Sequence, residues 1–164
     1  MASVQKIVTN LWFDTEAEEA AYFYTSIFKN STVGTILRYG EAGPREAGMV
    51  LTVDFTLEGQ KFTAINGGPE FKFTEAVSLL VNCESQDKID ELWEKLSADG
   101  GETSVCGWLK DKYGLSWQVT PTVLEEMLAR EDHTSARFNS VMNAMLKMKK
   151  LDIAELEKAC AEAS

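Results

Sequence analysis

Two hydrophobic periods succeed one another in the first third of the chain. An apolar run over residues 7–13 has the length of a strand, and the next apolar positions recur every three or four residues, as in an amphipathic helix. The helical positions are Ala17, Ala20, Ala21, Tyr24 and Phe28. Thr15 and Glu18 have the spacing of a capping box at the start of this helix. Three β-type runs follow, at 32–39, 49–57 and 61–66, so the pattern predicts a β-α-β-β-β module over residues 5–67.

The same order of elements recurs over residues 74–121. The pattern predicts a strand at 75–82, a helix at 86–98, a short strand at 102–104, and two further strands at 105–109 and 115–120. Leu11-Trp12-Phe13-Asp14 matches Leu79-Leu80-Val81-Asn82, and Gly59-x-x-Phe62 matches Gly114-x-x-Trp117. The repeat rests on pattern rather than on identical residues. We therefore expect an α+β fold in which two repeated βαβββ modules form a curved mixed sheet.

Residues 122–164 have a helical pattern and are predicted to form a C-terminal extension. Thr122 and Glu125 again have the spacing of a capping box. The apolar stripe Phe138, Val141, Met142 and Met145 indicates a helix, and Ile153 and Leu156 indicate a short last one. The methionine-containing stripe is typical of core packing, with a ligand-facing lid as the alternative. We expect the whole chain, 1–164, to be a single domain.

Charge and composition exclude several classes of partner. The 164 residues carry a formal net charge of −10, which does not favour nucleic-acid binding. The longest apolar runs are too short to span a bilayer, and the first residues do not resemble a secretory signal, so we expect a cytoplasmic protein without a membrane partner. The three cysteines, Cys83, Cys106 and Cys160, are widely separated and fit a reducing compartment.

Several motifs resemble those of one family. They are Leu11-Trp12-Phe13-Asp14-Thr15 with Phe23-Tyr24, Asn66-Gly67-Gly68-Pro69 with Phe71-Lys72-Phe73, Cys106-Gly107-Trp108-Leu109-Lys110-Asp111, Gly114-Leu115-Ser116-Trp117-Gln118, and the segment 145–152. Together they resemble the PhnB-like proteins of the glyoxalase/bleomycin-resistance, or vicinal-oxygen-chelate, superfamily. The resemblance implies paired βαβββ modules, a homodimer and a small-molecule ligand in a cavity of the curved sheet.

Members of this family are often labelled 3-demethylubiquinone 3-methyltransferase-like. A methyltransferase that uses S-adenosylmethionine normally has a glycine-rich turn from a strand into a helix. Gly67-Gly68 and Gly100-Gly101 are isolated pairs, and neither joins a predicted strand to a following helix. The sequence therefore predicts no S-adenosylmethionine site and no other cofactor.

Metal-binding members of the superfamily draw their ligands from the first and last strands of each module. Carried over by register, these positions fall at Thr9, Thr63, Val77 and Gln118, of which only Gln118 is a plausible ligand. A slip of one residue would instead offer Asn10, Phe62, Ser78 and Val119 or Trp117, which is no better. The chain has one histidine, His133, which lies beyond both modules. Catalytic metal sites need about three histidine or carboxylate ligands, so we expect no metal at these positions.

Other candidate chemistry lies in the motif-rich segments. Cys106 is a candidate nucleophile and Lys110 a candidate neighbouring cation, with a small buried thiol as the alternative for Cys106. Aromatic residues with a few polar neighbours are typical of ligand pockets. The residues expected to bind a ligand are Trp12, Arg38, Thr63, Asn66, Phe73, Trp108 and Gln118. Plain core packing is the alternative for each aromatic residue. Two functions remain open: a metal-free small-molecule-binding protein, or an enzyme that acts on a small metabolite with non-metal groups.

Overall fold

The chain divides into two compact units in the computed structural model, which describes residues 4–163. The first unit ends at Phe73 and the second begins at Thr74. Residues 1–3 and 164, which the predicted domain boundaries include, lie outside the described residues. The expected single domain over the whole chain stays a prediction.

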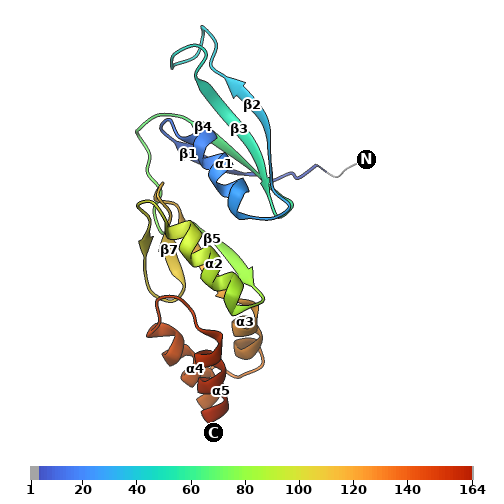
Figure 1. Cartoon of the computed structure of the whole chain (residues 1–164), viewed down its shortest axis with the longest axis vertical. Helices are drawn as coiled ribbons and strands as arrows, with labels where there is room; N and C mark the ends of the chain where they lie inside the picture. The colour runs from blue at the N-terminus through green and yellow to red at the C-terminus, as the bar shows by residue number, and fades with distance from the viewer. Residues whose placement is uncertain (1–3, 164) are drawn as a thin grey trace. The chain divides into compact units, whose positions relative to one another are not determined.

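The first unit is a β-α-β-β-β module (Figure 1). Its elements are β1 (Thr9–Phe13), α1 (Ala17–Ile27), β2 (Thr32–Arg38), β3 (Val50–Leu57) and β4 (Gln60–Asn66). The strands form one sheet in the order β1-β4-β3-β2. β1 and β4 are parallel, whereas the β3–β4 and β2–β3 pairs are antiparallel.

The second unit repeats this topology. Its elements are β5 (Ser78–Cys83), α2 (Gln86–Ser97), β6 (Glu102–Thr103), β7 (Trp108–Lys110) and β8 (Ser116–Pro121). The sheet order is β5-β8-β7-β6, again with the first and last strands parallel. The α+β class and the repeated βαβββ modules are confirmed. The described strands form two four-stranded sheets, one in each unit.

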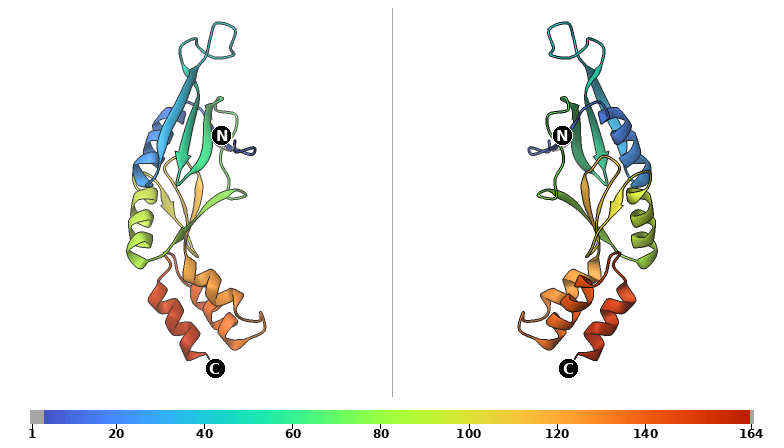
Figure 2. Two further views of the ribbon diagram at one scale, coloured as in Figure 1. Left: turned by 90° about the vertical axis from the view of Figure 1, so that its right-hand side faces the viewer. Right: turned by 90° about the vertical axis from the view of Figure 1, so that its left-hand side faces the viewer.

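One helix covers one face of each sheet, as both views in Figure 2 show. Alternation along the strands sends every second side chain toward that helix. In the first unit, Phe55 and Phe62 stack with ring centroids 5.3 Å apart, and Phe55 also stacks on Tyr24 of α1. In the second unit, the buried side chains of β7 and β8 include Leu109 and Trp117. Burial of these apolar surfaces is the main stabilising contribution within each unit.

Neither predicted capping box forms. The N-cap of α1 is Glu16, without a side-chain cap, and the backbone N–H of Ala17 instead donates to Asn66 Oδ1 at 2.8 Å. The N-cap of α3 is Pro121, which also makes no side-chain cap. Because β8 runs directly into this helix, the Thr122 hydroxyl lies inside the first turn and donates to the Cys83 carbonyl at 3.5 Å. The observed N-cap lies one residue after the expected Thr15 in α1 and one residue before the expected Thr122 in α3.

The C-terminal extension packs as three helices: α3 (Thr122–Ala129), α4 (Ala136–Leu146) and α5 (Ile153–Glu162). Their core is the cluster Leu124, Val141, Leu151 and Leu156, against which Met145 and Met148 pack. Core packing is therefore the structural role of Val141 and Met145 in the predicted stripe. No helix within residues 4–163 has the length and apolar character needed to cross a membrane.

Backbone hydrogen bonds tie this extension to the rest of the second unit. The N–H groups of Cys106 and Gly107 donate to the carbonyls of Met148 and Lys149, each at 2.8 Å. The Gln86 side chain at the start of α2 donates to the Leu151 carbonyl and accepts from the Ile153 N–H. The bonds from Cys106 and Gly107 hold the turn that precedes β7, which borders the pocket described below.

Candidate functional site

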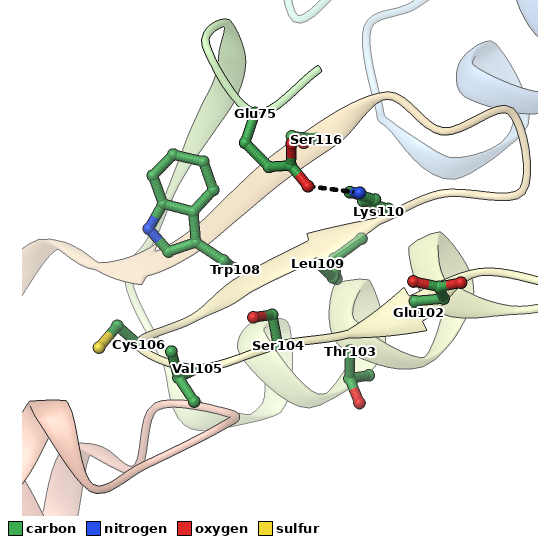
Figure 3. A pocket seen from close by; sticks show the side chains of 10 residues that line it. All are labelled: Glu75, Glu102, Thr103, Ser104, Val105, Cys106, Trp108, Leu109, Lys110 and Ser116. Atoms are coloured by element: carbon green, nitrogen blue, oxygen red, sulfur yellow. Dashed lines mark ion pairs between the residues drawn. The ribbon is translucent and has the colours of Figure 1, made fainter. Parts of the chain in front are cut away.

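A pocket of about 480 Å³ lies within the second unit. Its lining comes from β6, β7, the turn before β7, the first residue of β8 and the segment before β5 (Figure 3). The lining residues are Glu75, Glu102, Thr103, Ser104, Val105, Cys106, Trp108, Leu109, Lys110 and Ser116. The volume is in the range of small-molecule sites in proteins.

Strand alternation explains which side chains reach the pocket. Lys110 pairs with Ser116, and Trp108 pairs with Gln118, so these four positions share one face of the sheet. We call this the pocket face. The intervening residues Leu109 and Trp117 are buried and belong to the other face, although Leu109 also borders the pocket. Trp117 is further held by a hydrogen bond from its Nε1 to Asp111 Oδ2 at 2.9 Å.

Ser116 is the most unusual residue of the pocket. Its side chain is fully buried, yet its Oγ has no hydrogen-bond partner among the described residues. A buried hydroxyl without a partner is unfavourable, because it has lost its hydrogen bonds to water without replacement. Gln118, two residues along the same strand, instead donates to Ser78 Oγ at 2.9 Å. A polar atom of a ligand bound in this pocket could therefore supply the hydrogen-bond partner that Ser116 Oγ lacks.

An ion pair between Glu75 and Lys110 lies at the end of the pocket away from Cys106, as drawn in Figure 3. The hydrogen bond from Lys110 lowers the pKa of Glu75, and the same bond raises the pKa of Lys110. Glu102 pairs with Lys110 in register and adds a second negative charge at this end. Both partners are solvent-exposed, so the pair contributes little to stability.

Cys106 also lines the pocket, in a turn of unusual backbone conformation. Cys106 and Gly107 have φ angles of 58° and 81°, the left-handed region that disfavours a residue with a β-carbon. Figure 3 shows Cys106 and Lys110 at opposite ends of the pocket, and the Lys110 ammonium group faces Glu75 rather than the thiol. The two catalytic candidates thus share a pocket without contacting each other.

The other expected ligand-binding residues belong to the first unit and have contacts within it. The Trp12 indole donates to the Gly68 carbonyl at 2.9 Å, and Phe73 packs edge-on against Phe13 with ring centroids 5.3 Å apart. Arg38 Nη1 donates to the Gly48 carbonyl at 3.1 Å, and Thr63 Oγ1 donates to an Asp54 oxygen at 2.8 Å.

Asn66 has the most extensive internal contacts of this set. Its Oδ1 accepts the bond from Ala17, and its Nδ2 donates to the Val50 carbonyl at 3.1 Å. The backbone carbonyl of Asn66 accepts from the Tyr39 hydroxyl at 2.7 Å. The side chain is buried. A role in ligand binding stays a prediction for all five residues.

Of the seven expected ligand-binding residues, only Trp108 lines the pocket, and Gln118 lies beside it on the pocket face. Ser116, Glu75 and Glu102 also line the pocket and were not expected from the sequence. Ser116 could have been found by alternation, because it lies two positions from Gln118 and therefore on the same face. Glu75 and Glu102 have no comparable signal in the sequence.

The strand register corrects the expected metal positions. Thr63 pairs with Asn10 rather than Thr9, so Thr9 and Thr63 lie on opposite faces of the first sheet. In the second sheet Gln118 pairs with Leu80, and Val77 precedes β5. The corrected neighbours, Asn10 and Leu80, supply neither imidazole nor carboxylate. Within the described part of the chain, no three His, Cys, Asp or Glu side chains gather closely enough to hold a metal ion. These residues do not fit a catalytic metal.

The strand-to-helix connections do not fit a nucleotide-type cofactor either. β1 leads into α1 through Asp14-Thr15-Glu16, and β5 leads into α2 through Glu84-Ser85. Neither connection contains glycine, which would let the backbone approach a cofactor closely. Both sheets are mixed, and each helix covers only one face.

Comparison with known proteins shows the family. The family model described as 3-demethylubiquinone-9 3-methyltransferase matches residues 5–120. A PhnB protein from Bacillus cereus that carries the same description is 43% identical; the match covers 72% of this chain and 100% of that chain, with a TM-score of 0.66. No curated protein matches the chain.

More distant structures share the fold alone. Protein PA1353 from Pseudomonas aeruginosa is 21% identical, with a TM-score of 0.59 over 73% of this chain and 98% of that chain. The fosfomycin resistance protein FosX from Listeria monocytogenes is 18% identical, with a TM-score of 0.51 over 77% and 98%. The resemblance to the PhnB-like proteins is confirmed: the chain belongs to the family described as 3-demethylubiquinone-9 3-methyltransferase, and it shares its fold with FosX.

Proposed function

We propose that this chain is a metal-free small-molecule-binding protein whose ligand occupies the pocket of the second unit. The observation that carries the proposal is the unpartnered, fully buried hydroxyl of Ser116 in a pocket walled by Trp108. An indole ring offers a large flat apolar surface, and a buried hydroxyl adds one directional contact. This combination suits a ligand with an apolar ring and a polar end.

The metal-free part of the proposal rests on ligand chemistry. The positions that face each other across β1 and β4 are Asn10 and Thr63, and those across β5 and β8 are Leu80 and Gln118. Two amides, a hydroxyl and an alkyl chain make a poor set for a transition metal, which prefers imidazole, thiolate or several carboxylates. A ligand in the pocket would then be recognised by protein groups alone, without a metal ion.

A thermal-shift screen of uncharged aromatic fragments, each also tested on Trp108→Ala, tests this proposal. We expect fragments that raise the melting temperature of the natural protein and lose most of that effect in Trp108→Ala. Trp93→Ala on α2, outside the pocket lining, is the matched control and should retain the shift. Micromolar Zn²⁺, Ni²⁺, Mn²⁺ or Fe²⁺ should not stabilise the protein. Stabilisation by one of these ions would contradict the proposal. So would shifts in melting temperature that are equal in the natural protein and in Trp108→Ala.

An enzyme acting through non-metal groups is the second candidate, and one observation favours it. The Cys106 thiol lines the pocket from a residue held at a φ of 58°, and strained backbone often occurs at functional sites. A substrate that alkylates or acylates Cys106 would support this candidate. Turnover that survives Cys106→Ser would exclude the thiol as its nucleophile.

The proposal includes a homodimer in the cytoplasm, on the family resemblance. All three cysteines are free thiols, as expected in a reducing compartment. Light scattering on the purified chain should give twice the 18.2 kDa of one chain. A monomer at micromolar concentration would remove this part of the proposal and leave the pocket unaffected.

A further inference from the structure

We propose that the pocket binds a monocarboxylate with a single aromatic ring, and that the Glu75 side chain occupies the place of the ligand's carboxylate until the ligand displaces it. This inference rests on the proposed function and adds the chemical class of the ligand. Two observations support it. The two partners of the Glu75–Lys110 ion pair differ in how firmly the structure holds them. The hydroxyl of Ser116, which lines the same pocket, has no hydrogen-bond partner among the described residues.

Lys110 is the fixed partner of this ion pair. It lies at the end of β7, which pairs with β6 on one side and with β8 on the other. Ser116, its direct neighbour on β8, is equally fixed and is fully buried. A cation and a hydroxyl held side by side on adjacent strands can both donate to one carboxylate.

Glu75 is the replaceable partner. It precedes β5 in a turn whose described hydrogen bonds are local and long: Ala76 N–H to Thr74 Oγ1 at 3.3 Å, and Val77 N–H to the Thr74 carbonyl at 3.5 Å. The Glu75 side chain is 60% exposed, and Val77 is 63% exposed. Besides the bond from Lys110, the Glu75 carboxylate accepts a hydrogen bond from its own backbone N–H. These contacts are local, so little packing holds the carboxylate at the pocket.

The exchange favours a ligand carboxylate. Moving Glu75 into water breaks an exposed ion pair, which is weak, and the ligand forms an equivalent pair with Lys110. The ligand gains in addition the hydroxyl of Ser116, which has no partner in the described structure. The ligand carboxylate therefore makes one hydrogen bond, to Ser116 Oγ, that the Glu75 carboxylate does not make.

Register sets the size of the ligand. Trp108 pairs with Gln118 and Lys110 pairs with Ser116, so Trp108 and Ser116 are diagonal neighbours on the pocket face. Diagonal neighbours on antiparallel strands are about 7–8 Å apart. One aromatic ring on Trp108 with a carboxylate on a short linker spans that distance.

Glu102 limits the charge of the ligand. It pairs in register with Lys110 and remains at the pocket when Glu75 leaves. One carboxylate is therefore balanced by Lys110, whereas a doubly charged group such as a phosphate would meet Glu102 without a second cation from the pocket lining.

Titration calorimetry with phenylacetate and its uncharged isostere phenylacetamide tests this inference. We expect Glu75→Gln to bind phenylacetate at least fivefold more tightly than the natural protein does, because the internal competitor is gone. Ser116→Ala in the Glu75→Gln background should lose at least fivefold of that affinity. Glu94→Gln, which removes one exposed carboxylate from α2 outside the pocket, is the matched control for net charge and should leave the affinity unchanged.

Phenylacetamide separates this inference from the proposed function. Its affinity should not rise in Glu75→Gln. If both probes bind with equal affinity and both depend on Trp108, the carboxylate inference is overturned while the pocket remains a binding site. The inference is also overturned if the affinity for phenylacetate is unchanged by both the Glu75 and the Ser116 substitution, or if Glu75→Gln does not bind phenylacetate. The uncharged-fragment screen then decides the proposed function separately.

Discussion

Asn66 Oδ1 accepts a hydrogen bond from the backbone N–H of Ala17 at 2.8 Å, across 49 residues of sequence. Asn66 is the last residue of β4, and Ala17 is the first residue of α1. A side chain distant in sequence thus satisfies one of the unpaired N–H groups at the start of this helix, a task that a local cap usually performs.

Asn66→Ala should destabilise the first unit by about 2–3 kcal/mol. The substitution leaves the Ala17 N–H and the Val50 carbonyl without their buried partner. Urea unfolding followed by circular dichroism measures the change. Asn66→Asp keeps the acceptor for Ala17 and should lose less than Asn66→Ala; equal stability of all three proteins would show that these bonds contribute nothing.

Ser116→Ala should raise the free energy of unfolding by about 1 kcal/mol. The substitution removes a buried hydroxyl that has no partner within residues 4–163 and leaves the rest of the site intact. Chemical denaturation of the natural protein and the variant, without added ligand, measures the difference. A clear loss of stability would mean that the hydroxyl already has a partner, which contradicts its availability to a ligand.

Gly107→Ala should destabilise the second unit by about 2–4 kcal/mol. Gly107 has a φ of +81°, and an added β-carbon would lie 2.8 Å from the Val119 carbonyl oxygen and 3.0 Å from Leu151 Cδ1. Both strain and a backbone clash therefore act against alanine.

Gly114→Ala is the matched control for this prediction. Gly114 has a similar φ of +87°, but nothing lies within 4 Å of an added β-carbon. It should lose only about 1 kcal/mol, the cost of the left-handed conformation. Equal losses at the two positions would contradict the close packing of Leu151 on the turn before β7.

Stability should fall at alkaline pH because of Cys83. Burial raises the pKa of this thiol from 9.0 to about 11, an effect that Lys88 partly offsets. The folded protein holds the thiol proton more tightly than the unfolded chain, so this contribution is complete below pH 9 and is lost as the pH rises through 11. Between pH 8 and pH 10.5 the loss should be about 2 kcal/mol.

Cys83→Ala isolates this contribution, because all other titrating groups remain. The drop in unfolding free energy between pH 8 and pH 10.5 should be smaller in the variant by the stated amount. Parallel pH profiles of the natural protein and the variant would mean that the Cys83 thiol is not shielded from solvent.

The element order could be predicted from the sequence because hydrophobic period and glycine turns are local signals. Even the two-residue β6 fell within the expected piece at 102–104. The strand register could not, because the parallel pairs are set by contacts distant in sequence. A difference of one residue placed Thr63 beside Asn10 instead of Thr9 and changed which side chains share a face.

The candidate site was predictable only in part, for a related reason. Trp108, Cys106 and Lys110 belong to a recognisable motif, and all three line the pocket. Ser116 has no distinctive sequence signal, since its importance arises from burial without a partner. Asn66 shows the converse, because a polar residue in a motif has its side-chain amide bonded to the backbone of two other elements.

The decisive measurement is a crystal structure of the protein soaked with aromatic fragments. We expect a fragment in the pocket of the second unit, with its ring on the Trp108 indole and a polar atom within hydrogen-bond distance of Ser116 Oγ. Fragments that bind elsewhere and leave this pocket to solvent, at concentrations that saturate the thermal shift, would contradict it.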